Sequence, residues 1–119
     1  MKILLVEDDD AVRSTLHEVL MDDEHTVGEA SSAEEALSKL PGEYNLIISD
    51  IRLKKMDGIG LLETVSRMQP KIPVIIITGF GGVEIEEECR EKGAVGFLNK
   101  PFSVHKLLGL IGEVCKKTC

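Results

Sequence analysis

Four short and almost uninterrupted apolar runs constrain the fold of this chain more than any other feature. They cover residues 3–6, 46–48, 74–77 and 95–98, the last with a glycine inside it. Short runs that are apolar at every position are typical of strands buried on both faces of a sheet. A weaker run over residues 26–30 is expected to add a strand at the edge of that sheet.

Between these runs the apolar residues recur at helical spacing, so each intervening segment is predicted to be a helix. The fourth such segment, residues 83–92, is rich in glutamate and would bury little. The other stripes are Val12, Leu16, Val19 and Leu20; Ala33, Ala36, Leu37 and Leu40; Leu61, Leu62, Val65 and Met68; and Val104, Leu107, Leu108, Ile111 and Cys115.

Strands that alternate with helices must run parallel, with right-handed crossovers that place helices on both faces. We therefore predict one α/β domain over residues 1–119, a doubly wound five-stranded parallel sheet. Local signals agree with the boundaries. Asp9 or Asp10 can cap the first helix, and Ser32 with Glu35 forms a capping box for the second.

The charge and the cysteines exclude several classes of protein. Against 14 Lys and Arg there are 21 Asp and Glu, a net charge of −7 that opposes binding to nucleic acid and to anionic membranes. The three cysteines form no Cys-x-x-Cys pair, which favours the reducing cytoplasm over a disulfide framework or a zinc site. The first apolar run is too short for a signal peptide or a membrane span, so no membrane partner is expected.

Polar side chains stand at the carboxyl ends of the predicted strands. Glu7 and Asp8 follow the first, Asp50 ends the third, Thr78 ends the fourth and Lys100 follows the fifth. Ligands of open parallel sheets bind just beyond these ends, so the five residues are expected to meet at one edge.

Three carboxylates in one place repel one another unless a cation lies among them. Hard oxygen ligands without histidine or cysteine favour Mg²⁺, with Mn²⁺ as the alternative, and disfavour zinc. A carboxylate beside such an ion can attack phosphorus and form an aspartyl phosphate. Lys100 would neutralise one phosphoryl oxygen, and Thr78 could donate a hydrogen bond to another.

Taken together, these motifs resemble the receiver domains of two-component response regulators over essentially the whole chain. The segments that carry the resemblance are Leu5-Val6-Glu7-Asp8-Asp9, Ile48-Ser49-Asp50, Met56-Asp57-Gly58, Thr78-Gly79 and Lys100-Pro101-Phe102. The glycines that follow Thr78 and the segment around Lys100 look most like receivers attached to sigma-54-type activators.

The resemblance implies the flavodoxin-like strand order 2-1-3-4-5 for the sheet and a role for each of these residues. Asp50 would be the phospho-acceptor, and Glu7 and Asp8 would hold Mg²⁺ together with the main-chain carbonyl of Arg52. Thr78 and Phe97 match the switch pair of the family, and Lys100-Pro101 matches a peptide bond that is usually cis. Lys54-Lys55 departs from the proline common there, and Phe97 lacks a tyrosine hydroxyl.

The function implied is that of a cytoplasmic phosphorylation switch rather than an enzyme. Asp50 would take its phosphoryl group from a sensor histidine kinase or a phosphotransfer protein, and the altered surface would control an effector domain, an effector protein or a phosphorylation-dependent homodimer. The chain could be free-standing or part of a longer regulator.

Three other functions remain open at this point. An aspartate-nucleophile phosphatase would need an acid where Arg52 stands, and a flavin-binding module would need glycines and hydroxyls where residues 7–10 are acidic. A non-phosphorylated interaction module would have no use for the acids and Lys100. Asp9, Asp10 and Asp57 are interpreted as helix caps or turn residues.

Overall fold

The computed structural model describes residues 1–40, 43–51, 58–68, 72–79 and 82–118, with side chains as far as residue 116. Strands and helices alternate along the chain, as predicted. They are β1 (Lys2–Val6), α1 (Asp10–Asp22), β2 (Thr26–Ala30), α2 (Ala33–Lys39), β3 (Leu46–Asp50), α3 (Gly58–Ser66), β4 (Val74–Thr78), α4 (Val83–Glu91), β5 (Gly96–Asn99) and α5 (Val104–Thr118).

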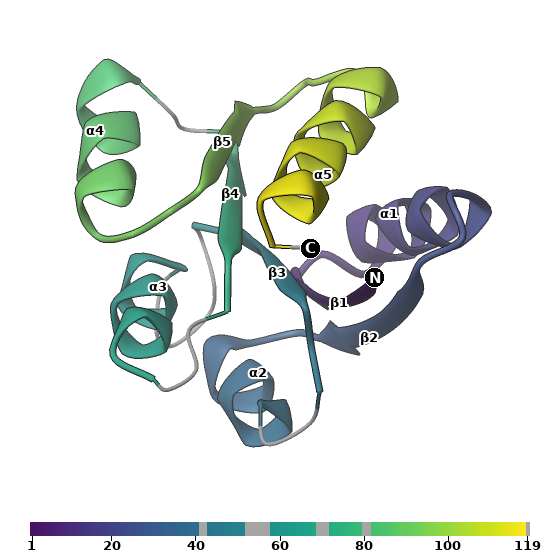
Figure 1. Cartoon of the computed structure of the whole chain (residues 1–119), viewed down its shortest axis with the longest axis horizontal. Coiled ribbons are helices and arrows are strands. Elements are labelled where there is room, and N and C mark those ends of the chain that lie inside the picture. The colour runs from purple at the N-terminus through teal and green to yellow at the C-terminus, as the bar shows by residue number, and fades with distance from the viewer. Residues whose placement is uncertain (41–42, 52–57, 69–71, 80–81, 119) are drawn as a thin grey trace.

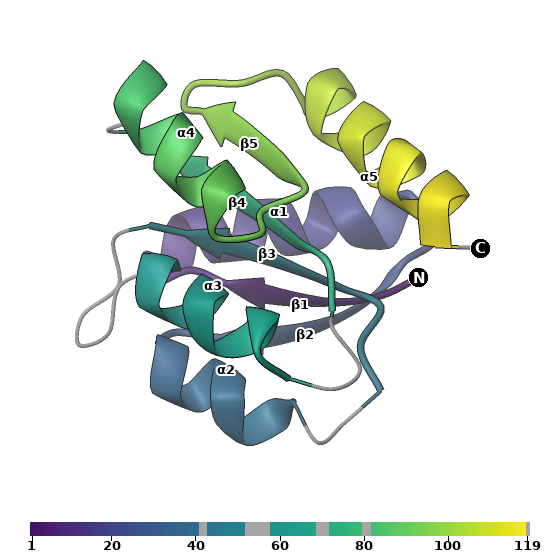
Figure 2. The ribbon, with the colours of Figure 1, turned by 60° about the vertical axis from the view of Figure 1, so that its left-hand side comes forward.

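The five strands form one sheet in the order β2-β1-β3-β4-β5, and every neighbouring pair is parallel. This confirms the predicted fold class and strand order. Helices α1 and α5 cover one face of the sheet, and α2, α3 and α4 cover the other (Figures 1 and 2). Within the described part of the chain, no helix has both the length and the apolar character needed to cross a membrane.

Each face of the sheet has its own core, because successive side chains of a strand point to opposite faces. In β1, Leu4 and Val6 belong to the cluster under α2 to α4, whereas Ile3 and Leu5 pack beneath α1 and α5. The inner strands β3 and β4 are buried at every position, as the continuous apolar runs predict. The edge strand β2 is only partly buried.

The fifth strand differs from its predicted bounds. It begins at Gly96 rather than at Val95, whose side chain is 46% exposed. The main-chain N–H of Val95 still donates to the carbonyl of Val74, at 2.9 Å. Val95 is therefore apolar without being part of the core.

Helix capping largely follows the sequence. Asp9 caps α1 by accepting from the main-chain N–H groups of Ala11 and Val12. At α2, Ser32 Oγ accepts from the N–H of Glu35 as predicted, but the Glu35 carboxylate returns to the N–H of Ser31 rather than to that of Ser32. Helix α4 buries only Cys89 among its residues, which agrees with the weak apolar stripe.

Candidate functional site

Asp50, Glu7 and Lys100 meet at the carboxyl edge of the sheet. Asp50 is the last residue of β3, and Glu7 and Lys100 are the first residues after β1 and β5. The register aligns the inner strand ends, because Val6 pairs with Ser49, and Asp50 pairs with Ile77. The topology therefore brings together residues that are as many as 93 positions apart in the sequence.

The Lys100 ammonium donates to both buried carboxylates. Its Nζ lies 2.7 Å from Asp50 Oδ2 and 3.0 Å from Glu7 Oε1. Glu7 is 1% exposed and Asp50 is 6% exposed, whereas the lysine side chain keeps 27% of its surface in solvent. One cation thus faces two acids that water reaches poorly.

This imbalance shifts the pKa values of Glu7 and Lys100. Burial raises the pKa of Glu7, and the nearby charge of Asp50 raises it further, although hydrogen bonds from Lys100 and from the Asp9 N–H oppose the shift. Burial lowers the pKa of Lys100, but its hydrogen bonds to Asp50 and Glu7 outweigh burial, so its pKa is raised. The ammonium is stabilised in its charged form, and one further cation would relieve the excess of negative charge.

Glu7 is fixed in place by its own main chain as well as by Lys100. Its N–H donates to the carbonyl of Ala30 at 3.0 Å, and its carbonyl accepts from Arg13 Nη1 at 2.7 Å. Its Oε2 accepts from the N–H of Asp9 at 3.3 Å. A carboxylate oxygen held in this way keeps a defined direction toward Asp50.

The donor set fits a hard divalent cation such as Mg²⁺. Glu7 and Asp50 each direct an oxygen to within 3.0 Å of a single cationic nitrogen, so the two carboxylates already converge on one positive centre. Asp8 follows directly and is half-buried. Within the described residues, no three His, Cys, Asp or Glu side chains gather as closely as metal ligands do. The magnesium site therefore stays a prediction.

Thr78 and Lys100 are joined through the main chain. The N–H of Lys100 donates to the carbonyl of Thr78 at 2.7 Å, and Thr78 is fully buried. The Lys100-Pro101 peptide bond is cis, as the family resemblance implies. The hydroxyl-bearing end of β4 thus lies next to the ammonium-bearing end of β5.

Comparison with known proteins identifies the family. A family model described as the response regulator receiver domain matches residues 3–112. The chain belongs to this family. The match favours the receiver over the phosphatase and flavin-binding alternatives.

Similar proteins agree with this assignment. The receiver domain is 40% identical over 113 residues to the response regulator protein FleR of Pseudomonas aeruginosa, a match over 94% of this chain and 24% of FleR. It is 36% identical over 116 residues to the transcriptional regulatory protein FixJ of Bradyrhizobium diazoefficiens, covering 97% of this chain and 57% of FixJ. The chain thus spans about a quarter of the length of FleR and just over half of the length of FixJ.

Solved structures show the same fold. The CheY-like response regulator receiver domain protein from Methanospirillum hungatei JF-1 has a TM-score of 0.91 and 32% identity, over 98% of this chain and 94% of that one. The receiver domain of Francisella response regulator 1452 has a TM-score of 0.94 and 26% identity, over 99% and 98% of the two chains.

Phe97 of the receiver domain lies within the core rather than at its surface. It is 8% exposed and belongs to the cluster beneath α2 to α4. It pairs in register with Ile76, two residues before Thr78, so Phe97 and Thr78 lie toward the same face of the sheet. Both members of the predicted switch pair are thus buried on the same face of the sheet, the one covered by α2, α3 and α4.

Some predicted residues lie outside the described part of the receiver domain. These include Arg52, predicted to offer its main-chain carbonyl to the metal, and Lys54, Lys55 and Asp57. The roles assigned to them stay predictions.

Sequence reasoning missed two residues that contact the site. Gly58 begins α3 directly against the main chain of Asp50, and Arg13 holds the carbonyl of Glu7. The sequence shows Gly58 only as part of the Asp-Gly motif. Arg13 carries no signal except an acid three residues earlier.

Proposed function

We propose that this receiver domain accepts a phosphoryl group on Asp50 and acts as a phosphorylation switch in two-component signalling. The observation that carries the proposal is the buried Asp50 carboxylate held 2.7 Å from the Lys100 ammonium, beside the second buried acid, Glu7. Membership of the receiver family supports the same role.

The chemistry is a transfer of the phosphoryl group from nitrogen to oxygen. A carboxylate oxygen of Asp50 forms the new bond to phosphorus while the bond from phosphorus to the imidazole nitrogen of a phosphohistidine breaks. The electron pair of that bond stays on the imidazole, which takes a proton from solvent.

Lys100 has a role both before and during this transfer. It holds the Asp50 carboxylate in one orientation, and its charge is placed to balance a phosphoryl oxygen as negative charge accumulates. When bound, Mg²⁺ would neutralise charge on the phosphoryl oxygens, with Mn²⁺ able to substitute. The residues that would hold it are Glu7, Asp8, Asp50 and the main-chain carbonyl of Arg52.

The switch follows from the contacts that the phosphoryl group adds. It brings roughly one more negative charge and three acceptor oxygens to the edge of the sheet. Lys100 and Thr78 can bond to those oxygens in one conformation better than in another, and Phe97 on the same face can repack behind Thr78. A preference of about 3 to 5 kcal/mol is enough to invert the population.

The partners follow from the proposed chemistry and from the relatives. A sensor histidine kinase or a phosphotransfer protein in the cytoplasm would donate the phosphoryl group, and an effector domain, an effector protein or a second copy of the chain would receive the signal. Relatives named as a sensor kinase, CckA of Brucella abortus, and as a transcriptional regulator, FixJ, support both ends of this path. Attachment to a sigma-54-type activator is the output we propose.

The test uses a small phosphodonor in place of the kinase. The protein is incubated with acetyl phosphate and MgCl₂, and its intact mass is measured. We expect wild type to gain one phosphoryl group and Asp50→Asn to gain none, while Asp22→Asn, at an exposed position of α1, behaves as wild type. Equal gain by Asp50→Asn, or no gain by wild type, would show that Asp50 is not the acceptor.

A further inference from the structure

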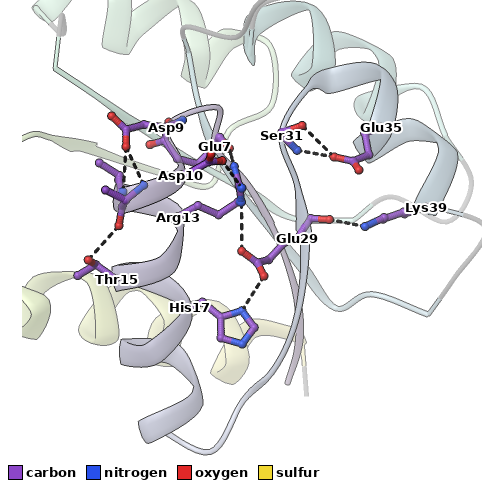
Figure 3. A network of polar contacts seen from close by, with 12 residues as sticks. Glu7, Asp9, Asp10, Arg13, Thr15, His17, Glu29, Ser31, Glu35 and Lys39 are labelled. Carbon is purple, nitrogen blue, oxygen red and sulfur yellow. Dashed lines mark hydrogen bonds and ion pairs between the residues drawn. The ribbon is translucent and has the colours of Figure 1, made fainter.

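One arginine joins the acidic loop after β1 to the edge strand of the sheet. Arg13 uses three nitrogens on three acceptors, as Figure 3 shows. Nη1 donates to the main-chain carbonyl of Glu7 at 2.7 Å, Nε to Glu29 Oε1 at 3.1 Å, and Nη2 to Asp10 Oδ1 at 2.5 Å. The side chain is only 18% exposed, so it is a built part of the structure rather than a mobile surface group.

The contact at Glu7 fixes a peptide plane inside the candidate site. The carbonyl that Arg13 binds belongs to the peptide between Glu7 and Asp8, so its direction also sets the N–H of Asp8. The preceding N–H of Glu7 is bound to the carbonyl of Ala30 at the end of β2. Both main-chain groups of Glu7 are therefore tied to the β2 side of the molecule.

The anchor of Arg13 on β2 is itself held in place. The main-chain carbonyl of Glu29 accepts from the Lys39 ammonium, and its Oε2 lies 3.3 Å from His17 Nδ1 (Figure 3). Lys39 thus holds the main chain of Glu29, whereas the His17 ring lies beside the Glu29 carboxylate without a hydrogen bond from its Nδ1. The planar guanidinium meets acceptors on the loop, the helix and the strand with three separate nitrogens held in one fixed plane, whereas an ammonium offers a single nitrogen.

We infer that Arg13 is a positioning residue for Glu7 and Asp8, and that it orients the peptide between them so that both carboxylates can bind Mg²⁺ beside Asp50. This inference rests on the proposed function. It assigns Arg13 no contact with the metal or with the phosphoryl group.

Electrostatics alone predicts the opposite effect on metal binding. A guanidinium next to an acidic pair repels a divalent cation, so loss of its charge should tighten Mg²⁺ binding if charge were all that mattered. Loss of a group that orients metal ligands weakens binding instead. The sign of the change in Mg²⁺ affinity therefore separates positioning from simple charge.

The experiment compares wild type with Arg13→Gln, Arg13→Lys and Arg90→Gln. Arg90 pairs with Glu86 at 3.0 Å on α4, so its variant removes the same charge without touching the acidic loop. Mg²⁺ affinity is measured by calorimetry on the unphosphorylated protein and by competition with Mn²⁺ followed by electron paramagnetic resonance. Thermal unfolding without metal checks that each variant is folded.

We expect both Arg13 variants to bind Mg²⁺ about tenfold more weakly than wild type and Arg90→Gln to match wild type. In phosphorylation by acetyl phosphate, the Arg13 variants should need more Mg²⁺ for half-maximal rate yet approach the wild-type rate at saturating Mg²⁺. Arg13→Lys keeps the charge but loses the three separate nitrogens of the guanidinium, so it tests their geometry even if Arg13→Gln does not fold.

The outcomes separate this inference from the proposed function. Wild type that binds Mg²⁺ while Arg13→Gln binds it equally or more tightly would overturn the positioning role alone, and wild-type affinity in Arg13→Lys would do the same. Wild type that binds no Mg²⁺ and gains no phosphoryl group would overturn the proposed function together with this inference.

Discussion

Gly58, the first residue of α3, packs directly against the main chain of Asp50. A Cβ atom at this position would lie 2.2 Å from the Asp50 carbonyl oxygen and 2.8 Å from the Cα of Ile51. The opposing atoms are backbone and cannot rotate away as a side-chain tip could. Only glycine allows α3 to begin this close to the candidate phospho-acceptor.

We expect Gly58→Ala to lower the free energy of unfolding by about 1 to 3 kcal/mol because of overpacking. The same substitution at Gly109 is the matched control. That glycine is exposed on α5, and a Cβ atom added to it would meet no atom of another element within 4 Å, so Gly109→Ala should stabilise the helix by about 0.5 to 1 kcal/mol. Urea unfolding of both variants measures the difference, and equal effects of the same sign would contradict this account.

A second expectation at this scale concerns the cation between the two buried acids. Lys100→Met leaves Glu7 and Asp50 facing each other without their shared donor, and we expect a loss of about 1 to 3 kcal/mol in unfolding free energy at neutral pH. Adding Asp50→Asn should restore part of that loss, because only one buried charge then remains. Thermal unfolding is the measurement, with the exposed Lys106→Met as control. A double variant less stable than Lys100→Met would argue against charge repulsion as the cause.

The sequence was sufficient to predict that the charged residues of the site meet, but not which other residues hold them in place. Glu7, Asp50 and Lys100 stand at strand ends, and a parallel sheet brings such ends to one edge whatever the loops do. The close approach of Gly58 and the three contacts of Arg13 depend on how two elements pack, which the periodicity of a single sequence does not contain.

Among the secondary-structure elements, the N-terminus of α2 is expected to make the stability of the fold depend on pH. Glu35 Oε1 accepts from the main-chain N–H of Ser31, and this bond lowers the pKa of Glu35, with smaller contributions from the charges of Lys39 and Arg13. A carboxylate whose pKa is depressed by folding stabilises the protein above its unfolded pKa and loses that contribution as the pH falls through the folded value.

We therefore expect Glu35→Gln to lower the melting temperature at neutral pH, because the charge-assisted bond to Ser31 is lost. The difference from wild type should shrink as the pH falls below about 4.3, the ordinary pKa of a glutamate. Calorimetry over a pH series measures it, with Glu34→Gln, an exposed neighbour on the same first turn, as control. A difference that persists unchanged into acid would mean that the bond does not depend on the ionised carboxylate.

The bounds of a strand or helix could be predicted from the sequence where burial determines which residues are apolar. The inner strands β3 and β4 are apolar because both their faces are covered, so their runs could be found without a structure. The apolar character of Val95 predicts that it belongs to the fifth strand, yet it is exposed just before Gly96. The Glu35 carboxylate turns to Ser31 instead of Ser32, a choice between adjacent N–H groups that the capping pattern does not distinguish.

For the molecule as a whole, the two layers of helices are not equally attached to the sheet. Helix α5 buries Leu107, Ile111 and Val114 against the sheet, in the same core as α1, whereas α4 contributes only Cys89 at full burial. Val83, at the start of α4, is 74% exposed. Because local opening is opposed mainly by buried apolar contact, the free energy of opening should differ between these two helices.

Hydrogen exchange of the native protein, resolved by peptide mass spectrometry or by NMR, measures this difference directly. We expect the hydrogen-bonded amides of α4 to exchange well before those of α5, and the amides of β3 and β4 to exchange last, near the rate of global unfolding. Trimming the one fully buried side chain of α4 by Cys89→Ala should speed exchange in α4 more than in α5. Protection of α4 equal to that of the inner strands would contradict this expectation.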